Sequence, residues 1–228
     1  MKLYMKLYMH PASTTSRPVM QFIADAKLDV EQQVVDIFKG EHYGDPYTKL
    51  NPNRLIPLLE DGDFRLSESA TILRYLAEKS GSPAYPKELR RRAKVDELLD
   101  WFNSNFYRDW GYGLVYPQVF PQLKRPDEAV QAATVAWGRD KAKIWLQVLN
   151  DHWIGPSKTY LLGADITIAD YFGTALVTAG ELIHCDFKPY ANVTRWLGAM
   201  KARPSYAEVY KFFNGFCEST KGQSFAAL

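Results

Sequence analysis

The sequence lacks the features that mark metal, redox and nucleic-acid-binding proteins. Only two of its 228 residues are cysteines, Cys185 and Cys217, and they form neither a Cys-x-x-Cys pair nor a Cys/His cluster. We therefore expect neither a metal site nor a redox dithiol. The formal net charge is only +2, and the most basic stretch is Lys-Glu-Leu-Arg-Arg-Arg at 87–92. Because phosphate binding requires a denser basic surface, we expect no nucleic-acid partner.

Long apolar runs are also missing. Lys2 and Lys6 interrupt the N-terminal segment, and no stretch approaches the ~18 consecutive apolar residues of a membrane span. With 46% hydrophobic and 24% charged residues, the composition is that of a folded globular protein. We expect a cytoplasmic protein without a membrane partner.

The first part of the chain alternates between strand and helix patterns. It starts with the tetrapeptide Met-Lys-Leu-Tyr twice, of which one copy suffices for a strand. Further on, Asp61-Gly62 suits the positive φ angles of a tight hairpin turn between two short strands. The expected strands are residues 1–8, 33–37, 58–60 and 64–66, and the expected helices are residues 17–27 and 69–79.

Residues 80–87 are rich in Gly, Ser and Pro and break this pattern. Beyond them the chain shows amphipathic helices, expected at residues 88–116, 127–153, 168–183, 191–202 and 205–214. We therefore expect an α/β domain over 1–79, a linker over 80–87 and an all-helical domain over 88–228. Thr167 and Asp170 have the spacing of a helix capping box, which indicates a folding role.

Hydroxyl side chains gather in the first strand-to-helix turn, as Ser13-Thr14-Thr15-Ser16 before Arg17. Backbone N–H groups at a helix start point outward unpaired and favour an anion or a thiolate. Hydroxyl residues are also common helix caps. The motif alone leaves both roles open.

A second pair of motifs lies around the third and fourth expected strands. Pro57 cannot donate to a strand ladder, so we expect it at a sheet edge or at a strand start. Glu68 and Ser69 open the next helix, where free backbone donors can hold a carboxylate and Glu68 can accept from an ammonium group. On its own, this second motif is also a capping signal.

In their order and spacing these motifs resemble the theta class of cytosolic glutathione transferases. The segments that carry the resemblance are 37–42 (Ile-Phe-Lys-Gly-Glu-His), 51–57 (Asn-Pro to Pro), 60–64 (Glu-Asp-Gly-Asp-Phe), 66–73 (Leu-Ser-Glu-Ser-Ala-Thr-Ile-Leu) and 92–97 (Arg-Ala-Lys-Val-Asp-Glu). No one motif is decisive, but the ordered series is specific. The run from Ser13 to Arg17 looks equally like the plant phi class, so the class remains open.

The resemblance implies the glutathione transferase fold: a thioredoxin-like α/β N-terminal domain followed by an all-α C-terminal domain, assembled as a homodimer. Glutathione would be the co-substrate, and Ser13 would stabilise its thiolate. The residues implied to bind glutathione are His42, Arg54, Ile56, Pro57, Glu68 and Ser69. The Ile56–Pro57 peptide bond would be cis, with the Ile56 backbone facing the cysteinyl part.

The helical domain is implied to supply the site for the electrophile. We expect this site to contain Phe106, Arg108, Trp110, Tyr112 and Tyr116, with Phe212, Phe213 and Phe216 as further candidates. Trp101, Trp145 and Trp153 are assigned to packing. Where theta enzymes can carry consecutive arginines this chain has Tyr107-Arg108, so we do not expect a sulfate-ester activity.

These features predict an enzyme that conjugates the glutathione thiolate to small hydrophobic electrophiles. Halides, epoxides, hydroperoxides and isothiocyanates all remain candidate substrates. The alternative is a non-catalytic protein of the same fold that carries apolar ligands or acts as an interaction module. A thiol-disulfide oxidoreductase is disfavoured, because the turn around Ser13 contains no cysteine.

Overall fold

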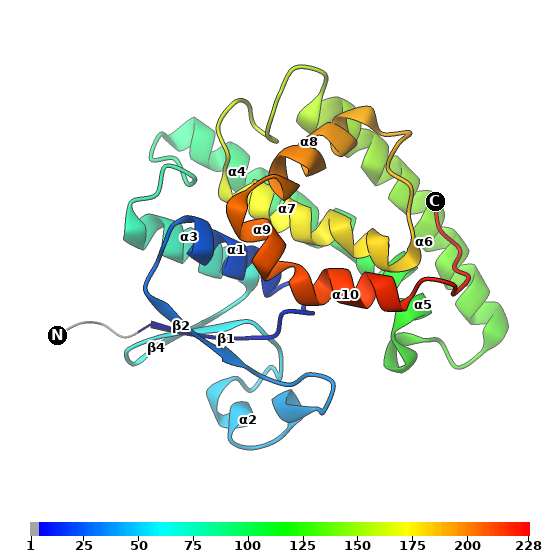
Figure 1. The fold of residues 1–228 in the computed structure, drawn as a ribbon, viewed down its shortest axis with the longest axis horizontal. Coiled ribbons are helices and arrows are strands. Elements are labelled where there is room, and N and C mark those ends of the chain that lie inside the picture. The colour runs from blue at the N-terminus through cyan, green and yellow to red at the C-terminus, as the bar shows by residue number, and fades with distance from the viewer. Residues whose placement is uncertain (1–4) are drawn as a thin grey trace.

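The computed structural model describes residues 5–228 (Figure 1). Within these residues four strands form one mixed sheet in the order β2-β1-β3-β4. The strands are β1 (Met5–Met9), β2 (Val30–Val34), β3 (Leu58–Asp61) and β4 (Phe64–Ser67). Strand β1 runs parallel to β2 and antiparallel to β3, which forms a hairpin with β4. The second Met-Lys-Leu-Tyr copy thus forms β1, whereas the first copy lies outside the described residues.

Helices cover both faces of this sheet (Figure 1). Helices α1 (Arg17–Asp25) and α3 (Ser69–Ser80) pack against the face that carries Leu7 and Leu59. The short helix α2 (Tyr47–Leu50), which follows the 3-10 turn η1 (Glu41–Tyr43), packs with Tyr8 and Leu58 on the opposite face. Successive strand residues point to opposite faces, so β1 contributes to both clusters.

The second strand differs from its expected position. It covers residues 30–34 rather than 33–37, and its register pairs Met5 with Val30 and Met9 with Val34. The Asp36 carboxylate accepts hydrogen bonds from the N–H groups of Phe38 and Lys39. This local turn removes residues 36 and 37 from the sheet.

The remainder of the described chain is helical. Its elements are α4 (Leu89–Trp101), η2 (Phe102–Phe106), η3 (Arg108–Val115), α5 (Tyr116–Val119), η4 (Pro121–Leu123), α6 (Glu128–Val148), η5 (Leu149–Ile154), α7 (Ile168–Thr178), η6 (Ala179–Ile183), α8 (Ala191–Lys201), α9 (Pro204–Val209) and α10 (Lys211–Ser219). Elements η2, η3 and η5 are π-helical, and η4 and η6 are 3-10. The expected α/β and all-α architecture is confirmed, whereas the boundary at 80–87 stays a prediction.

The π-helical stretch η3 matters for the site. Helix α6 crosses it so closely that a Cβ atom on Gly138 would lie only 2.4 Å from the backbone of Gly113. The hydrogen bonds of a π-helix span five residues rather than the four of an α-helix, so each turn holds more residues. This spacing carries Tyr107, which lies between η2 and η3, and Tyr112 onto the same side of the helix, toward the sheet.

Helix α7 runs through the centre of the helical part and is buried along its whole length. Its start confirms the predicted capping box: the Asp170 carboxylate accepts from the Thr167 N–H at 2.8 Å and from its hydroxyl at 2.9 Å. The same carboxylate accepts from the Leu161 N–H and the Trp196 indole. Asp170 is therefore a folding residue. Among residues 5–228, no helix has the length and apolar character needed to cross a membrane.

Candidate active site

Two adjoining cavities lie where the turn after β1 meets the π-helical stretch. The first, of about 560 Å³, lies beside Ser13, and the second, of about 390 Å³, lies beside Glu68 and Ser69. Their walls share Thr15, Leu55, Ile56, Tyr107 and Tyr112. They therefore form one continuous cleft between the sheet and the helical part.

The cleft brings together every residue predicted to bind glutathione. The first cavity is lined by Ser13, His42, Arg54 and Ile56 together with Tyr112 and Tyr116, and the second by Ile56, Pro57, Glu68 and Ser69 together with Arg108 and Tyr112. These residues come from five separate segments of the chain. Their roles toward a ligand stay predictions.

The Ser13 hydroxyl lies in the turn that leads into α1 and has two neighbouring polar groups. Its oxygen accepts from the Ser16 N–H at 3.2 Å and lies 3.1 Å from the Thr15 hydroxyl oxygen. Thr15 in turn donates to the Ile56 carbonyl at 3.1 Å. Ser13 therefore caps the helix turn through its lone pair. Its proton is not used in that bond, so the capping role is compatible with donation to a ligand.

A buried arginine holds this turn in place. Arg17 is fully buried and donates to the carbonyls of Ala12 at 2.8 Å and Ala175 at 3.3 Å. Its guanidinium lies 3.8 Å from the ring centre of Phe213. The contacts tie the Ser13 turn to α7 and α10, so Phe213 supports the turn from the core.

The loop that carries Arg54 and Ile56 is held by its own side chains. The Leu55 carbonyl accepts from the Asn51 amide at 2.7 Å and from the Tyr47 hydroxyl at 2.6 Å. The Ile56–Pro57 bond is cis, which confirms the prediction. A second cis bond, Asp45–Pro46, was not predicted.

Glu68 has an unusual backbone conformation, with φ 68° and ψ 113°. A non-glycine residue at positive φ is strained by the order of 1–3 kcal/mol, and such residues gather at functional sites. Glu68 precedes α3, and within the described residues its side chain makes no capping hydrogen bond. The first N–H groups of α3, which have no intrahelical partner, therefore lie beside the second cavity without a side-chain cap from Glu68.

His42 and Arg54 lie on the far side of the first cavity. Burial lowers the pKa of His42, so the imidazole is neutral at pH 7. Its Nδ1 atom is buried and has no hydrogen-bond partner among residues 5–228. Arg54 is exposed, and it forms no ion pair in the part of the chain that the structure describes. Both side chains have unused capacity to bind an anion.

Three tyrosines form the opposite wall. Tyr116 donates to the Thr14 hydroxyl at 2.7 Å, and the Tyr107 hydroxyl lies 2.8 Å from that of Tyr116. Burial raises the pKa of Tyr116 to about 12 and also raises the pKa of Tyr107. Both phenols therefore stay protonated near neutral pH and act as donors. Tyr112 is half exposed and offers its ring to the cavity.

Three residues named for the electrophile site lie elsewhere, and one of them is the further candidate Phe213, which is fully buried against Arg17. Phe106 and Trp110 are fully buried and line neither cavity, so the structure corrects these two assignments. The Trp110 indole donates to the Leu176 carbonyl at 2.9 Å, and Phe106 packs against it. The helix face to which they belong points into the core rather than the cleft. Arg108 lines the second cavity, but its guanidinium is paired with the Asp109 carboxylate.

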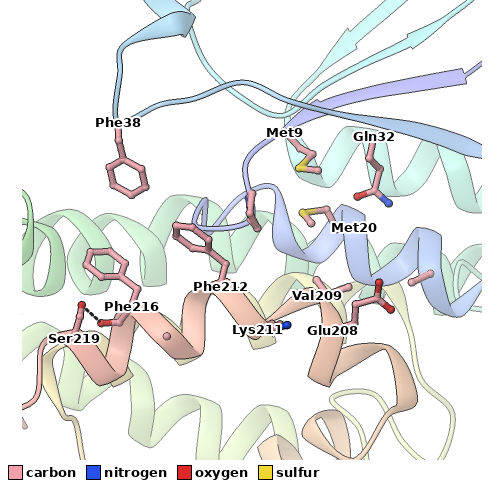
Figure 2. Close-up of a pocket in the computed structure, with 13 residues that line it drawn as sticks. Met9, Met20, Gln32, Phe38, Glu208, Val209, Lys211, Phe212, Phe216 and Ser219 are labelled. Atoms are coloured by element: carbon pink, nitrogen blue, oxygen red, sulfur yellow. Dashed lines mark hydrogen bonds between the residues drawn. The ribbon is translucent and has the colours of Figure 1, made fainter.

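An apolar groove of about 820 Å³ lies next to the first cavity (Figure 2). Its floor includes Met9 and Met20, and α10 forms one side with Phe212 and Phe216. Phe38 lines both this groove and the first cavity. Its ring is stacked with that of Phe212 and edge-on to that of Phe216, so these rings separate the two spaces.

Sequence reasoning missed several residues of the cleft. Thr15, Tyr107, Phe38 and Phe120 line it, and Asn51 fixes the loop beneath it. Asn51 and Phe38 were within the quoted motifs, but nothing in their residue types indicated a role. Among the described residues, no three His, Cys, Asp or Glu side chains gather as metal ligands would.

Comparisons with known proteins agree with this architecture. Residues 3–78 match the family model of the glutathione S-transferase N-terminal domain. Human glutathione S-transferase theta-1 is 35% identical over 182 residues, which are 79% of this chain and 72% of that relative. The structure of human glutathione transferase theta-2 in complex with glutathione has 27% identity and a TM-score of 0.83, covering 98% of this chain and 93% of the other. A delta-class glutathione transferase of Nilaparvata lugens has 28% identity and a TM-score of 0.78, covering 95% and 98%.

The chain therefore belongs to the glutathione S-transferase family, and its relatives place it with the theta class. The thioredoxin-like N-terminal domain and the glutathione transferase fold expected from the sequence are confirmed. The protein is an enzyme, a transferase that conjugates glutathione to electrophilic substrates.

Proposed function

We propose that Ser13 promotes this conjugation by donating a hydrogen bond from its hydroxyl group to the thiolate of bound glutathione. The observation that carries the proposal is the position of Ser13: it lines the cavity at the start of α1, with its proton free of the capping bond to Ser16. The step itself is a substitution or addition. The sulfur lone pair forms a bond to the electrophilic carbon. In a substitution the electron pair of the broken bond leaves with the displaced group, and in an addition it stays on a substrate atom, which takes up a proton.

The energies of these interactions are large enough to ionise the glutathione thiol at neutral pH. A free thiol with a pKa of ~8.5 is only about 3% ionised at pH 7. A hydrogen bond to a charged group contributes roughly 1.5–3 kcal/mol, and a helix N-terminus contributes about 0.3–1 kcal/mol. Since one pKa unit corresponds to about 1.36 kcal/mol, together they lower the thiol pKa by roughly 1–3 units.

Glutathione is assigned to the whole cleft, with its γ-glutamyl end in the second cavity. There the unpaired N–H groups of α3 and the Ser69 hydroxyl suit a carboxylate, and Glu68 suits an ammonium group. Ile56 lies in both cavities, at the place of the cysteinyl part, beside Pro57. The neutral His42 and the unpaired Arg54 then hold the glycine carboxylate in the first cavity.

The electrophile is assigned to the aromatic side of the first cavity, against Tyr112 and Tyr116. Phe38 and Phe120 extend this surface. Rings without charges suit small hydrophobic substrates. Arg108 is excluded from this group, because Asp109 neutralises it and it faces the second cavity.

The test of Ser13 is the pKa of the bound thiol, measured from the ultraviolet absorbance of the thiolate. Ser13→Ala should raise that pKa by about 1–2 units and lower kcat/KM at neutral pH by about ten- to a hundredfold. Ser13→Cys should form a mixed disulfide with oxidised glutathione on the peptide that contains residue 13, seen by mass spectrometry. An unchanged thiol pKa in Ser13→Ala would reduce Ser13 to a helix cap.

We also propose a cytoplasmic homodimer in which the domain over 1–79 of one subunit faces the helical domain over 88–228 of its partner. The linker over 80–87 connects the two domains. Sedimentation equilibrium at micromolar concentration tests the assembly, and a monomer mass there contradicts it.

A further inference from the structure

Three oxygen atoms form a short chain that leads from the proposed catalytic hydroxyl to the peptide backbone. The Ser13 and Thr15 hydroxyl oxygens are 3.1 Å apart, and the Thr15 hydroxyl donates to the Ile56 carbonyl at 3.1 Å. We call these three groups the hydroxyl chain. All three residues line the first cavity.

Counting protons fixes the direction of each bond. A hydroxyl has one hydrogen to donate, and a carbonyl has none. Thr15 uses its hydrogen at Ile56, so the hydrogen between Thr15 and Ser13 must belong to Ser13. In this arrangement the Ser13 hydrogen is directed at a protein oxygen and is not available to a ligand.

A thiolate beside Ser13 reverses this order. When Ser13 turns its hydrogen to sulfur, no hydrogen lies between its oxygen and that of Thr15. Two oxygen atoms at 3.1 Å with only lone pairs between them repel, unless Thr15 turns its own hydrogen toward Ser13. The Ile56 carbonyl then loses its donor, and a partly buried acceptor without a donor is unfavourable.

We propose that Thr15 is a positioning residue that couples the Ile56 carbonyl to Ser13, an inference that rests on the proposed role of Ser13. A ligand N–H that binds the Ile56 carbonyl replaces the hydrogen of Thr15. Thr15 then donates to Ser13, which leaves the Ser13 hydrogen free for sulfur and strengthens it as a donor. The cysteinyl residue of glutathione carries both an amide N–H and the thiol, so it satisfies both ends of the hydroxyl chain at once.

This coupling predicts effects of opposite sign for two ligands in Thr15→Val, which keeps the shape and removes the hydroxyl. For glutathione, the pKa of the bound thiol should rise, so that the ratio of thiolate to thiol at a given pH falls about tenfold. S-methylglutathione has no thiolate, so its binding does not depend on a hydrogen bond from Ser13. It should bind at least as tightly as to the native enzyme, because Thr15 no longer competes for the Ile56 carbonyl.

Thr15→Ser should restore both properties, and Thr15→Ala serves as a second variant without the hydroxyl if the valine is poorly tolerated. A double-mutant cycle with Ser13→Ala sharpens the test, since removing the Thr15 hydroxyl should leave the thiol pKa unchanged once Ser13 has lost its own hydroxyl. If the role of Thr15 were purely structural, its substitution would weaken the binding of both glutathione and S-methylglutathione, whether or not the Ser13 hydroxyl is present.

The outcomes separate the two proposals. If Ser13→Ala raises the thiol pKa and Thr15→Val does not, the proposed coupling through Thr15 is wrong, whereas the proposed role of Ser13 is supported. Weaker binding of both ligands by Thr15→Val, without rescue by serine, also overturns the coupling. If Ser13→Ala leaves the thiol pKa unchanged, the proposed function fails and the coupling fails with it.

Discussion

The two walls of the cleft are built in different ways. On the sheet side, loop backbone and polar side chains form the surface, and bonds behind them hold the loops: Leu55 accepts from two side chains, and Arg17 fixes the turn before α1. On the helical side, aromatic side chains form the surface. Several of these rings are partly exposed: Tyr112 is 49% and Phe212 46% exposed, and Phe38, which the loop after β2 places beside them, is 56% exposed.

The difference matches the two substrates. The same tripeptide binds in every reaction, and a surface whose loops are already held in place loses little conformational entropy when the tripeptide binds. Electrophiles vary in shape, and rings that turn can adapt to them. Substitutions should therefore alter glutathione binding sharply on the sheet side and shift electrophile preference gradually on the helical side.

The largest effect is expected at Glu68. Glu68→Gly relieves the strain at φ 68° and removes the carboxylate. The free energy of unfolding should therefore rise by about 1 kcal/mol, and the melting temperature should rise with it. Glutathione should bind about ten- to a hundredfold more weakly. Calorimetry of unfolding and of binding measures both quantities.

Lys27→Gly is the matched control for this change. Lys27 also has a positive φ, 52°, but it lies after α1 and lines neither cavity of the cleft. It should stabilise the fold and leave glutathione affinity unchanged. If Glu68→Gly binds glutathione as well as the native enzyme does, the carboxylate has no ligand role and the sheet side loses one of its fixed contacts.

A smaller effect is expected at Phe38, the ring between the first cavity and the apolar groove. Phe38→Ala joins the two spaces, so substrates with longer alkyl chains gain apolar contact worth about 0.8 kcal/mol, or about fourfold, per buried methylene. Turnover of an alkyl halide series should shift toward longer chains, with the KM for glutathione unchanged. Phe64→Ala, on β4 outside these spaces, is the control. An unchanged chain-length preference would mean that the groove does not communicate with the site.

The sheet side could be largely predicted from the sequence because its motifs are local. Pro57, Glu68 and Ser69 each occur at the boundary of an element, where proline and capping residues have few alternatives. The positive φ of Glu68 could not be predicted, since no residue-level preference favours it. Its conformation depends on the surrounding fold.

The helical side was predicted less well because ring position depends on helix geometry. Phe106 and Trp110 were expected in the cleft from their place in an aromatic stretch, whereas the π-helical turns direct them into the core and bring Tyr107 and Tyr112 to the wall of the cleft. A helical wheel with 3.6 residues per turn cannot show this. The shift of β2 has a similar origin, because the Asp36 turn decides where the strand ends.

The smallest effect concerns pH and His42, and its sign tests whether this imidazole faces an anion. Burial lowers the pKa of His42, so the free enzyme gains this proton only below the usual range. S-methylglutathione, which has no thiol to titrate, should bind more tightly as pH falls from about 7.5 to about 5, by about two- to fivefold, since an imidazolium attracts the glycine carboxylate more than a neutral ring does. Without ligand the sign reverses: the unfolded chain binds this proton more readily, so the stability of the fold falls as pH falls over the same range.

His42→Gln should abolish the gain in affinity at low pH. The control is His152→Gln, because His152 packs against Trp153 outside the cleft, and this variant should retain the gain. If affinity is flat with pH in the native enzyme, the glycine carboxylate is held by Arg54 alone.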